Sequence, residues 1–205
     1  MSSNVFTMSL TPNGVLTRKG RLILPLLAAG GVIYPFLVFF GLGRLPPGVF
    51  VGFALGLVAI RLAVHRGSAL GRALGPALVL VATVTVLTAL LDVGAAVKAW
   101  PVLMSFGMAM AFGLSLRWPP TLIEVFAAVV EPQPSDAART YMRRVALAWC
   151  LFLLVNTGLS AASWASGDLG LWTLYNGLIA YLSMGLMVVC EYMIRRRVRQ
   201  REAGA

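Results

Sequence analysis

Near its C-terminus the chain reads Leu174-Tyr-Asn-Gly-Leu-Ile-Ala-Tyr-Leu-Ser-Met-Gly-Leu-Met-Val-Val-Cys-Glu-Tyr-Met-Ile194, and Arg195-Arg-Arg-Val-Arg-Gln-Arg201 follows at once. Counted from Leu171, the apolar run makes a helix about 36 Å long, enough to cross the hydrocarbon core of a bilayer. Arginines directly after an apolar span are typical of the cytoplasmic end of a membrane helix. This part of the sequence therefore predicts a transmembrane helix that ends inside the cell.

The composition agrees with a membrane protein. Of the 205 residues 59% are hydrophobic and only 12% are charged, whereas a soluble domain carries roughly 25% charged residues. A net charge of +10 attracts nucleic acid in principle. Here, however, the positive residues lie at the edges of apolar runs, so we expect membrane lipids and no nucleic acid as partners.

We expect an all-α polytopic bundle of six transmembrane helices with both termini cytoplasmic. A single membrane domain, 18–197, would lie between a disordered N-terminal tail, 1–17, and a basic cytoplasmic tail, 198–205. The expected spans are 22–42, 48–64, 76–91, 101–116, 145–164 and 171–194. Pro76 is expected as the first residue of the third helix, and Lys98-Ala-Trp-Pro101 as the start of the fourth. All Lys and Arg residues except Arg44 and Lys98 then lie on the cytoplasmic side, as membrane topology favours.

Two local patterns add to this topology. Thr121 and Glu124 form a capping-box pattern, which predicts a short interfacial helix around 121–130. Gly48, Gly52 and Gly56 share one face of the second span, and this spacing predicts close packing against another helix.

Polar residues inside the expected spans are the candidate site, because polar groups are costly in hydrocarbon. They are Tyr34, Asn156, Asn176, Tyr181, Ser183 and Glu191. One interpretation is that they hold the helices together, with Asn156 and Tyr181 hydrogen-bonded across the fifth and sixth spans. The other is that they form the wall of a cavity for a lipid or acyl chain. The sequence leaves both open.

Catalytic and metal-binding patterns are absent from the sequence. The chain has one histidine, His65, and no carboxylate lies near it in sequence. The two cysteines, Cys150 and Cys190, are expected to be reduced and to behave as small apolar residues. We therefore expect a protein that is not an enzyme and that has no catalytic residues, no metal and no cofactor.

One motif occurs twice. Tyr34-Pro-Phe-Leu-Val-Phe-Phe-Gly41 resembles Trp100-Pro-Val-Leu-Met-Ser-Phe-Gly107, and the two copies lie in helices that are expected to run in opposite directions. An inverted repeat of two three-helix halves would give this arrangement. The motif is too short to establish such a repeat.

Several segments together resemble a known family. They are Tyr34–Leu42, Trp100–Leu103, Leu116-Arg-Trp-Pro-Pro120, Arg143–Cys150 with Asn156, and Leu174–Tyr181. They resemble the polytopic inner-membrane proteins encoded in aryl-polyene (xanthomonadin-type) pigment clusters, and more distantly the intracellular septation protein A family. The resemblance implies a bacterial inner membrane and a role near acyl carrier proteins and acyltransferases. It supplies no catalytic residues.

These observations lead to one functional hypothesis and two alternatives. We expect a non-catalytic accessory protein for assembly of a lipid-like acyl product, with a basic cytoplasmic face that docks an acyl carrier protein or an acyltransferase. The residues of this docking face are Arg139, Arg143, Arg144, Arg195, Arg196 and Arg197. Anchoring at the membrane surface explains the same arginines. The alternatives are a small transporter or flippase for that lipid, and an envelope or septation scaffold.

Overall fold

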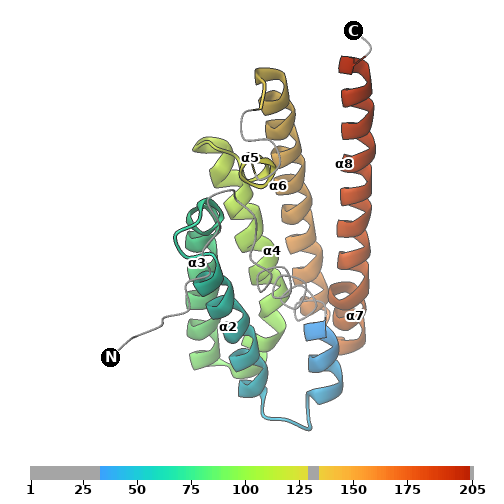
Figure 1. Cartoon of the computed structure of the whole chain (residues 1–205). Coiled ribbons are helices and arrows are strands. Elements are labelled where there is room, and N and C mark those ends of the chain that lie inside the picture. The colour runs from blue at the N-terminus through green and yellow to red at the C-terminus, as the bar shows by residue number, and fades with distance from the viewer. Residues whose placement is uncertain (1–32, 129–133, 204–205) are drawn as a thin grey trace, which may run out of the picture.

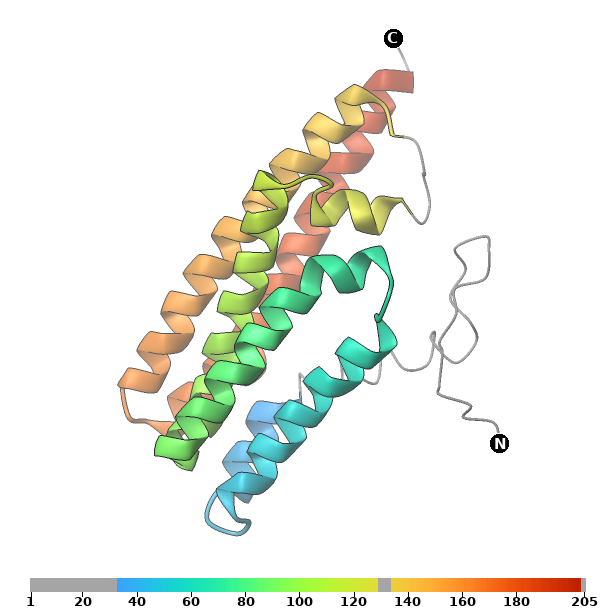
Figure 2. The ribbon, with the colours of Figure 1, turned by 90° about the vertical axis from the view of Figure 1, so that its left-hand side faces the viewer.

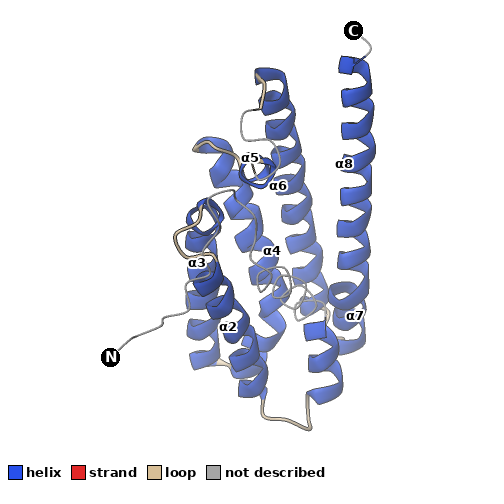
Figure 3. Cartoon of the chain, viewed as in Figure 1, coloured by secondary structure: helices blue, strands red, loops and turns tan. Residues whose placement is uncertain are grey.

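A computed structural model describes residues 33–128 and 134–203. Side chains are described as far as Arg197. The described residues form helices joined by short turns, with no strand among them (Figures 1 and 3). The helices are 33–41, α2 (Pro47–Val64), α3 (Ala69–Leu91), α4 (Val93–Arg117), α5 (Leu122–Ala127), α6 (Asp136–Ala165), α7 (Leu169–Leu174) and α8 (Ala180–Ala203). A π-helical turn, η1 (Tyr175–Ile179), joins α7 to α8.

The expected all-α membrane bundle is confirmed. Five helical stretches are long and apolar enough to cross a membrane: α2, α3, α4, α6 and the continuous helix from Leu169 to Arg197. Of the first expected span, 22–42, only 33–42 falls within the described residues, and 33–41 of it is helical. A count of six therefore stays a prediction, and the tail expected at 1–17 lies outside the described part.

Two helix starts differ from the expectation because polar caps set them, not prolines. The third helix begins at Ala69, since the Ser68 hydroxyl accepts a hydrogen bond from the Gly71 amide at 2.9 Å. Asp92 caps α4 in the same way, accepting from the Ala95 amide at 3.1 Å. Pro76 and Pro101 consequently lie inside their helices. The first turns of α3 bend away from the rest of that helix (Figure 2), as expected for an internal proline.

The short helix α5 has the predicted capping box. The Thr121 hydroxyl accepts from the Glu124 amide, and the Glu124 carboxylate accepts from the Thr121 amide, both at 3.3 Å. The helix is also held to the bundle, because the Leu122 amide donates to the Ser115 hydroxyl of α4 at 3.1 Å and the Leu122 side chain is fully buried. The remaining side chains of α5 are partly or fully exposed, and its place at a membrane interface stays a prediction.

The glycine face of α2 has no close partner among the described residues, and its packing against another helix stays a prediction. Nothing among the described residues lies within 4 Å of a Cβ atom built at Gly48, Gly52 or Gly56. The buried face of α2 carries Phe50 and Val58 instead. Larger apolar side chains bury more area than glycines, and here they determine which face turns inward.

α4 lies at the centre of the described bundle, between α3 and α6 (Figures 1 and 2). α8 stands at the edge and is the least buried of the five long apolar helices. The α2–α3 turn, α5, the start of α6 and the end of α8 lie at one end of the bundle. Most of the described basic residues belong to these segments, whereas Arg44 and Lys98 belong to the other end, which is the distribution that the predicted topology requires.

Candidate functional site

A cavity of about 450 Å³ lies inside the bundle, walled by 33–41, α2, α4, α5, α6, η1 and α8. Most of its lining is aromatic or aliphatic. The aromatic and sulfur-containing side chains are Tyr34, Trp100, Met104, Met108, Phe112, Phe126, Trp149, Tyr181 and Met184. The uncharged polar lining consists of Ser105, Asn156 and Asn176, and Arg61 carries the only formal charge in the described lining. An apolar cavity with a few polar groups is typical of small-molecule sites.

Four of the six residues predicted for a site line this cavity: Tyr34, Asn156, Asn176 and Tyr181. The other two do not. The Ser183 hydroxyl donates to the Ile179 carbonyl of its own helix at 2.8 Å. Glu191 lies farther along α8, where its backbone carbonyl accepts from the Tyr141 hydroxyl at 3.5 Å. Glu191 is seven residues beyond Met184, the last α8 residue in the described lining, and therefore lies about 10 Å farther along the helix.

Asn156 joins three helices. Its amide nitrogen donates to the Ser105 hydroxyl of α4 at 2.7 Å, and its amide oxygen accepts from the Tyr175 hydroxyl of η1 at 2.8 Å. The prediction that Tyr181 is its partner is wrong, because the hydroxyl that donates to Asn156 belongs to Tyr175, six residues before Tyr181. Tyr181 instead lies close enough to Arg61 of α2 for an electrostatic interaction.

Asn176 is fully engaged inside the protein. Its amide oxygen accepts from the Ser160 hydroxyl at 2.6 Å, and its amide nitrogen donates to the Ser163 hydroxyl at 3.2 Å and to the Trp172 carbonyl at 2.9 Å. The side chain is only 4% exposed. Asn156 and Asn176 therefore serve the structural role that was one of the two interpretations, and they also form part of the cavity wall.

Tyr34 compensates for a missing hydrogen bond in α4. Pro101 has no amide hydrogen, so the carbonyl of Val97, four residues before it, loses its helical partner. The Tyr34 hydroxyl donates to that carbonyl at 3.0 Å. The Tyr34 and Trp100 rings, the first residues of the repeated motif, also contact each other with centroids 6.0 Å apart.

The glycines that end the two motif copies are both closely packed, but against different partners. A Cβ atom at Gly41 would lie 2.7 Å from the Phe50 ring of α2, and one at Gly107 would lie 2.5 Å from a methyl group of Val81 in α3. In an inverted repeat of two three-helix halves, Gly107 would face the fifth span, α6. Gly107 faces α3 instead, so the packing at this glycine differs from that expected of an inverted repeat.

Replacing Tyr34 with phenylalanine is expected to lower the free energy of unfolding by about 1–2 kcal/mol, because the Val97 carbonyl would stay buried without a partner. Thermal unfolding of the purified protein in detergent measures the change. Tyr192→Phe on α8 is the matched control, since Tyr192 is exposed. Equal effects of the two substitutions would contradict the role given to Tyr34.

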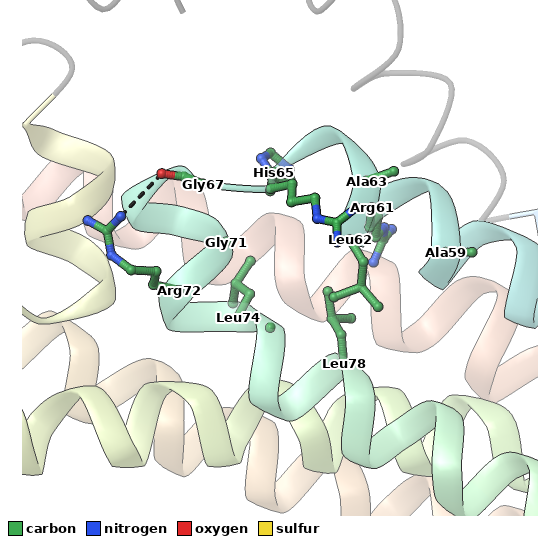
Figure 4. Close-up of a pocket in the computed structure, with 12 residues that line it drawn as sticks. Ala59, Arg61, Leu62, Ala63, His65, Gly67, Gly71, Arg72, Leu74 and Leu78 are labelled. Carbon is green, nitrogen blue, oxygen red and sulfur yellow. Dashed lines mark hydrogen bonds between the residues drawn. The ribbon is translucent and has the colours of Figure 1, made fainter. Parts of the chain in front are cut away.

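A second hollow, of about 490 Å³, lies at the α2–α3 turn and is basic (Figure 4). Arg61, His65, Arg66 and Arg72 line it, and its described lining contains no carboxylate. Arg72 donates to the Gly67 carbonyl at 3.2 Å, which holds the turn (Figure 4). Burial and the neighbouring Arg61 lower the pKa of His65 below its ordinary value, so the imidazole is neutral at pH 7 and the arginines supply the charge.

The tight α2–α3 turn depends on two glycines. Gly67 has φ +79°, a conformation that favours glycine. Gly71 lies directly against the backbone of His65, where an added Cβ atom would collide with the carbonyl group. The two glycines therefore bring the basic side chains of both helices to one hollow.

The docking face predicted for a carrier protein lies at a single end of the bundle. Arg139, Arg143 and Arg144 are exposed on the first turns of α6. Arg196 and Arg197 are exposed on α8, and Arg195 is half-buried. The two groups approach each other because Tyr141 of α6 contacts the α8 backbone at Glu191. Docking itself stays a prediction.

The described residues contain no group of three or more His, Cys, Asp and Glu side chains that could hold a metal ion. Cys150 and Cys190 are free thiols. The Cys150 thiol lies 3.5 Å from the Ala109 carbonyl of α4, where it acts as a small packing residue.

Several site residues were missed in the sequence. Arg61, Ser105, Tyr175, Ser160 and Ser163 are not among the residues predicted for the site. A signal for the serines was present, since Asn156, Ser160 and Ser163 follow one another at helical spacing on a single face of α6. No comparable signal indicates that Ile123 and Phe126 of α5 line the cavity, because that depends on how α5 folds back.

No match to the chain was found among protein-family models, curated proteins or solved structures. The cavity and its surroundings therefore carry the argument about function.

Proposed function

We propose that the chain is a non-catalytic membrane protein that holds a long-chain amphiphile in the cavity between α2, α4, α6 and α8. The observation that supports this most strongly is the cavity of about 450 Å³ with its largely aromatic and aliphatic lining. Small-molecule sites occupy roughly 300–1,000 Å³ and have linings of this kind.

The chemistry of the lining favours binding over reaction. Among the described lining residues there is no Asp, Glu, His, Cys or Lys, the side chains that most often transfer protons or form covalent intermediates. The amide groups of Asn156 and Asn176 are occupied by neighbouring side chains and by the backbone. They give the wall a fixed shape.

The resemblance noted for Tyr34–Leu42 and the other segments narrows the proposed ligand to an acyl product of the aryl-polyene type in a bacterial inner membrane. In this form of the proposal, the exposed arginines at the start of α6 and the end of α8 receive an acidic acyl carrier protein. The ligand would pass between that carrier and the cavity at the same end of the bundle.

Blocking the cavity is expected to abolish binding. Met184 lines the cavity, whereas Val188, one turn farther along α8, is exposed. A saturated long-chain fatty alcohol would be titrated into the purified protein, and bound molecules counted by native mass spectrometry. Met184→Trp should weaken binding about tenfold or more, and Val188→Trp should stay within about twofold of the unmodified protein. Equal affinity of the two variants would refute the cavity as the binding site.

Transport of the same amphiphile is the second candidate, and the join between α7 and α8 favours it. A π-helical turn lies at Tyr175–Ile179, and the α8 helix after it is the least buried of the long helices. Such turns occur often at functional sites, and weakly packed elements are the ones that move.

Deletion of the gene in its native host distinguishes transport from assembly. Lipids would be extracted from separated inner and outer membranes. Product that is made but retained in the inner membrane favours transport, whereas missing product favours a role in assembly. Normal product in both membranes would reject both and favour the envelope scaffold.

A further inference from the structure

Arg61 lies where the main cavity and the basic hollow adjoin. It is the only residue with a formal charge in the described lining of the first, and it also lines the second. Its side chain is close enough to Tyr181 on one side and to His65 on the other for electrostatic interactions. A molecule reaching from one space into the other would therefore pass the guanidinium group.

The two spaces differ in chemistry. The main cavity is largely aromatic and aliphatic, while the hollow adds Arg66 and Arg72 at the end of the bundle where the basic segments lie (Figure 4). The described linings of both spaces contain no Asp or Glu. An apolar chamber that opens toward positive charge complements a molecule with an apolar chain and an anionic head.

We propose that Arg61 binds the anionic head group of the amphiphile, a carboxylate or a phosphate, while its chain occupies the main cavity. Arginine suits this role because its planar fork of N–H donors matches two oxygens of either group. The proposal rests on the proposed function, since it assumes that the main cavity holds an amphiphile, and it adds the chemistry of the head.

The position of Arg61 along its helix agrees with such a ligand. It lies in the last turn of α2, one turn before the α2–α3 connection. An arginine there stabilises the negative end of the helix dipole and extends toward the head groups of the membrane. A head group bound at Arg61 would thus lie near the depth of the surrounding lipid head groups, with its chain directed into the bilayer.

The test compares three ligands with the same saturated chain: a fatty acid, an alkyl phosphate and a fatty alcohol. Each would be titrated into the purified full-length protein and counted by native mass spectrometry. The acid and the phosphate should bind about tenfold more tightly than the alcohol, as expected for one charge-assisted contact. Whichever anion binds more tightly identifies the head group as carboxylate or phosphate.

Three variants locate the effect. Arg61→Gln should remove the roughly tenfold preference for the two anions over the alcohol, because the charge and the fork of N–H donors are lost. Arg66→Gln is the matched control, since Arg66 lines the hollow but not the main cavity, and it should keep most of the preference. Arg61→Lys should retain part of it, because the charge remains without the fork.

The outcomes separate this proposal from the one on which it rests. If all three ligands bind equally to the unmodified protein, the cavity holds amphiphiles but the anionic head is refuted. If Arg66→Gln abolishes the preference as completely as Arg61→Gln, a diffuse basic surface and not Arg61 selects the anion. If none of the three ligands binds, both proposals fail.

Discussion

Replacing Asn176 with leucine is expected to lower the free energy of unfolding by about 2 kcal/mol. The asparagine amide makes three hydrogen bonds, to Ser160, Ser163 and Trp172, and side-chain hydrogen bonds in membranes are worth about 0.6 kcal/mol each on average. Leucine would break all three and leave the Ser160 hydroxyl buried without its present acceptor. Unfolding by denaturant in mixed micelles measures the loss.

Ser183→Ala is the control for this substitution. Ser183 lies on the same continuous helix and donates only to a carbonyl of that helix, so its removal should cost less than about 0.5 kcal/mol. An Asn176 variant as stable as the Ser183 variant would show that the polar cluster contributes nothing to the fold.

The contact between α3 and α4 gives the second large effect. Gly107→Ala should lower stability by about 1–2 kcal/mol, because the added methyl group would be placed 2.5 Å from a methyl of Val81. Val81→Ala removes that obstruction and should itself cost about 1 kcal/mol, since Val81 is buried. In the double variant the cost of Gly107→Ala should fall below about 0.5 kcal/mol, because the two positions are coupled.

Gly185→Ala supplies the reference for this cycle. Apart from its own helix, no atom of the described residues lies within 4 Å of a Cβ at Gly185, so the variant reports the general effect of replacing a helical glycine. It should be neutral or slightly stabilising. Additive effects of Val81→Ala and Gly107→Ala would contradict the close approach of the two helices.

The fold class could be predicted from the sequence because hydrophobic length is a local property. Each long apolar run is visible without knowing its neighbours, and the capping box at Thr121 and Glu124 needs only four residues. The positions of the prolines led to two wrong helix starts, because the partner of a freed carbonyl is not a local property. Pro76 and Pro101 read as helix starts, but a membrane helix can continue through proline where another group takes the freed carbonyl. For Pro101 that group is Tyr34, which is 67 residues away in the sequence.

The candidate site could be predicted only in part. The cost of polar groups in hydrocarbon pointed to Tyr34, Asn156, Asn176 and Tyr181, and all four line one cavity. Their partners could not be read from the sequence, because hydrogen-bonding pairs depend on how the helices are placed and turned. The glycine face of α2 shows the same limit, since spacing indicates which residues share a face but not which face turns inward.

The connection between α3 and α4 consists of one residue, Asp92. Two helices joined so closely form an antiparallel pair from the moment both exist, and the pair can enter the lipid phase together. α3 has the highest mean hydropathy of the five long helices, whereas α4 has the lowest and is the most buried. During biogenesis, therefore, the more apolar helix would carry its less apolar neighbour into the bilayer, before α6 has been synthesised to cover the other side of α4.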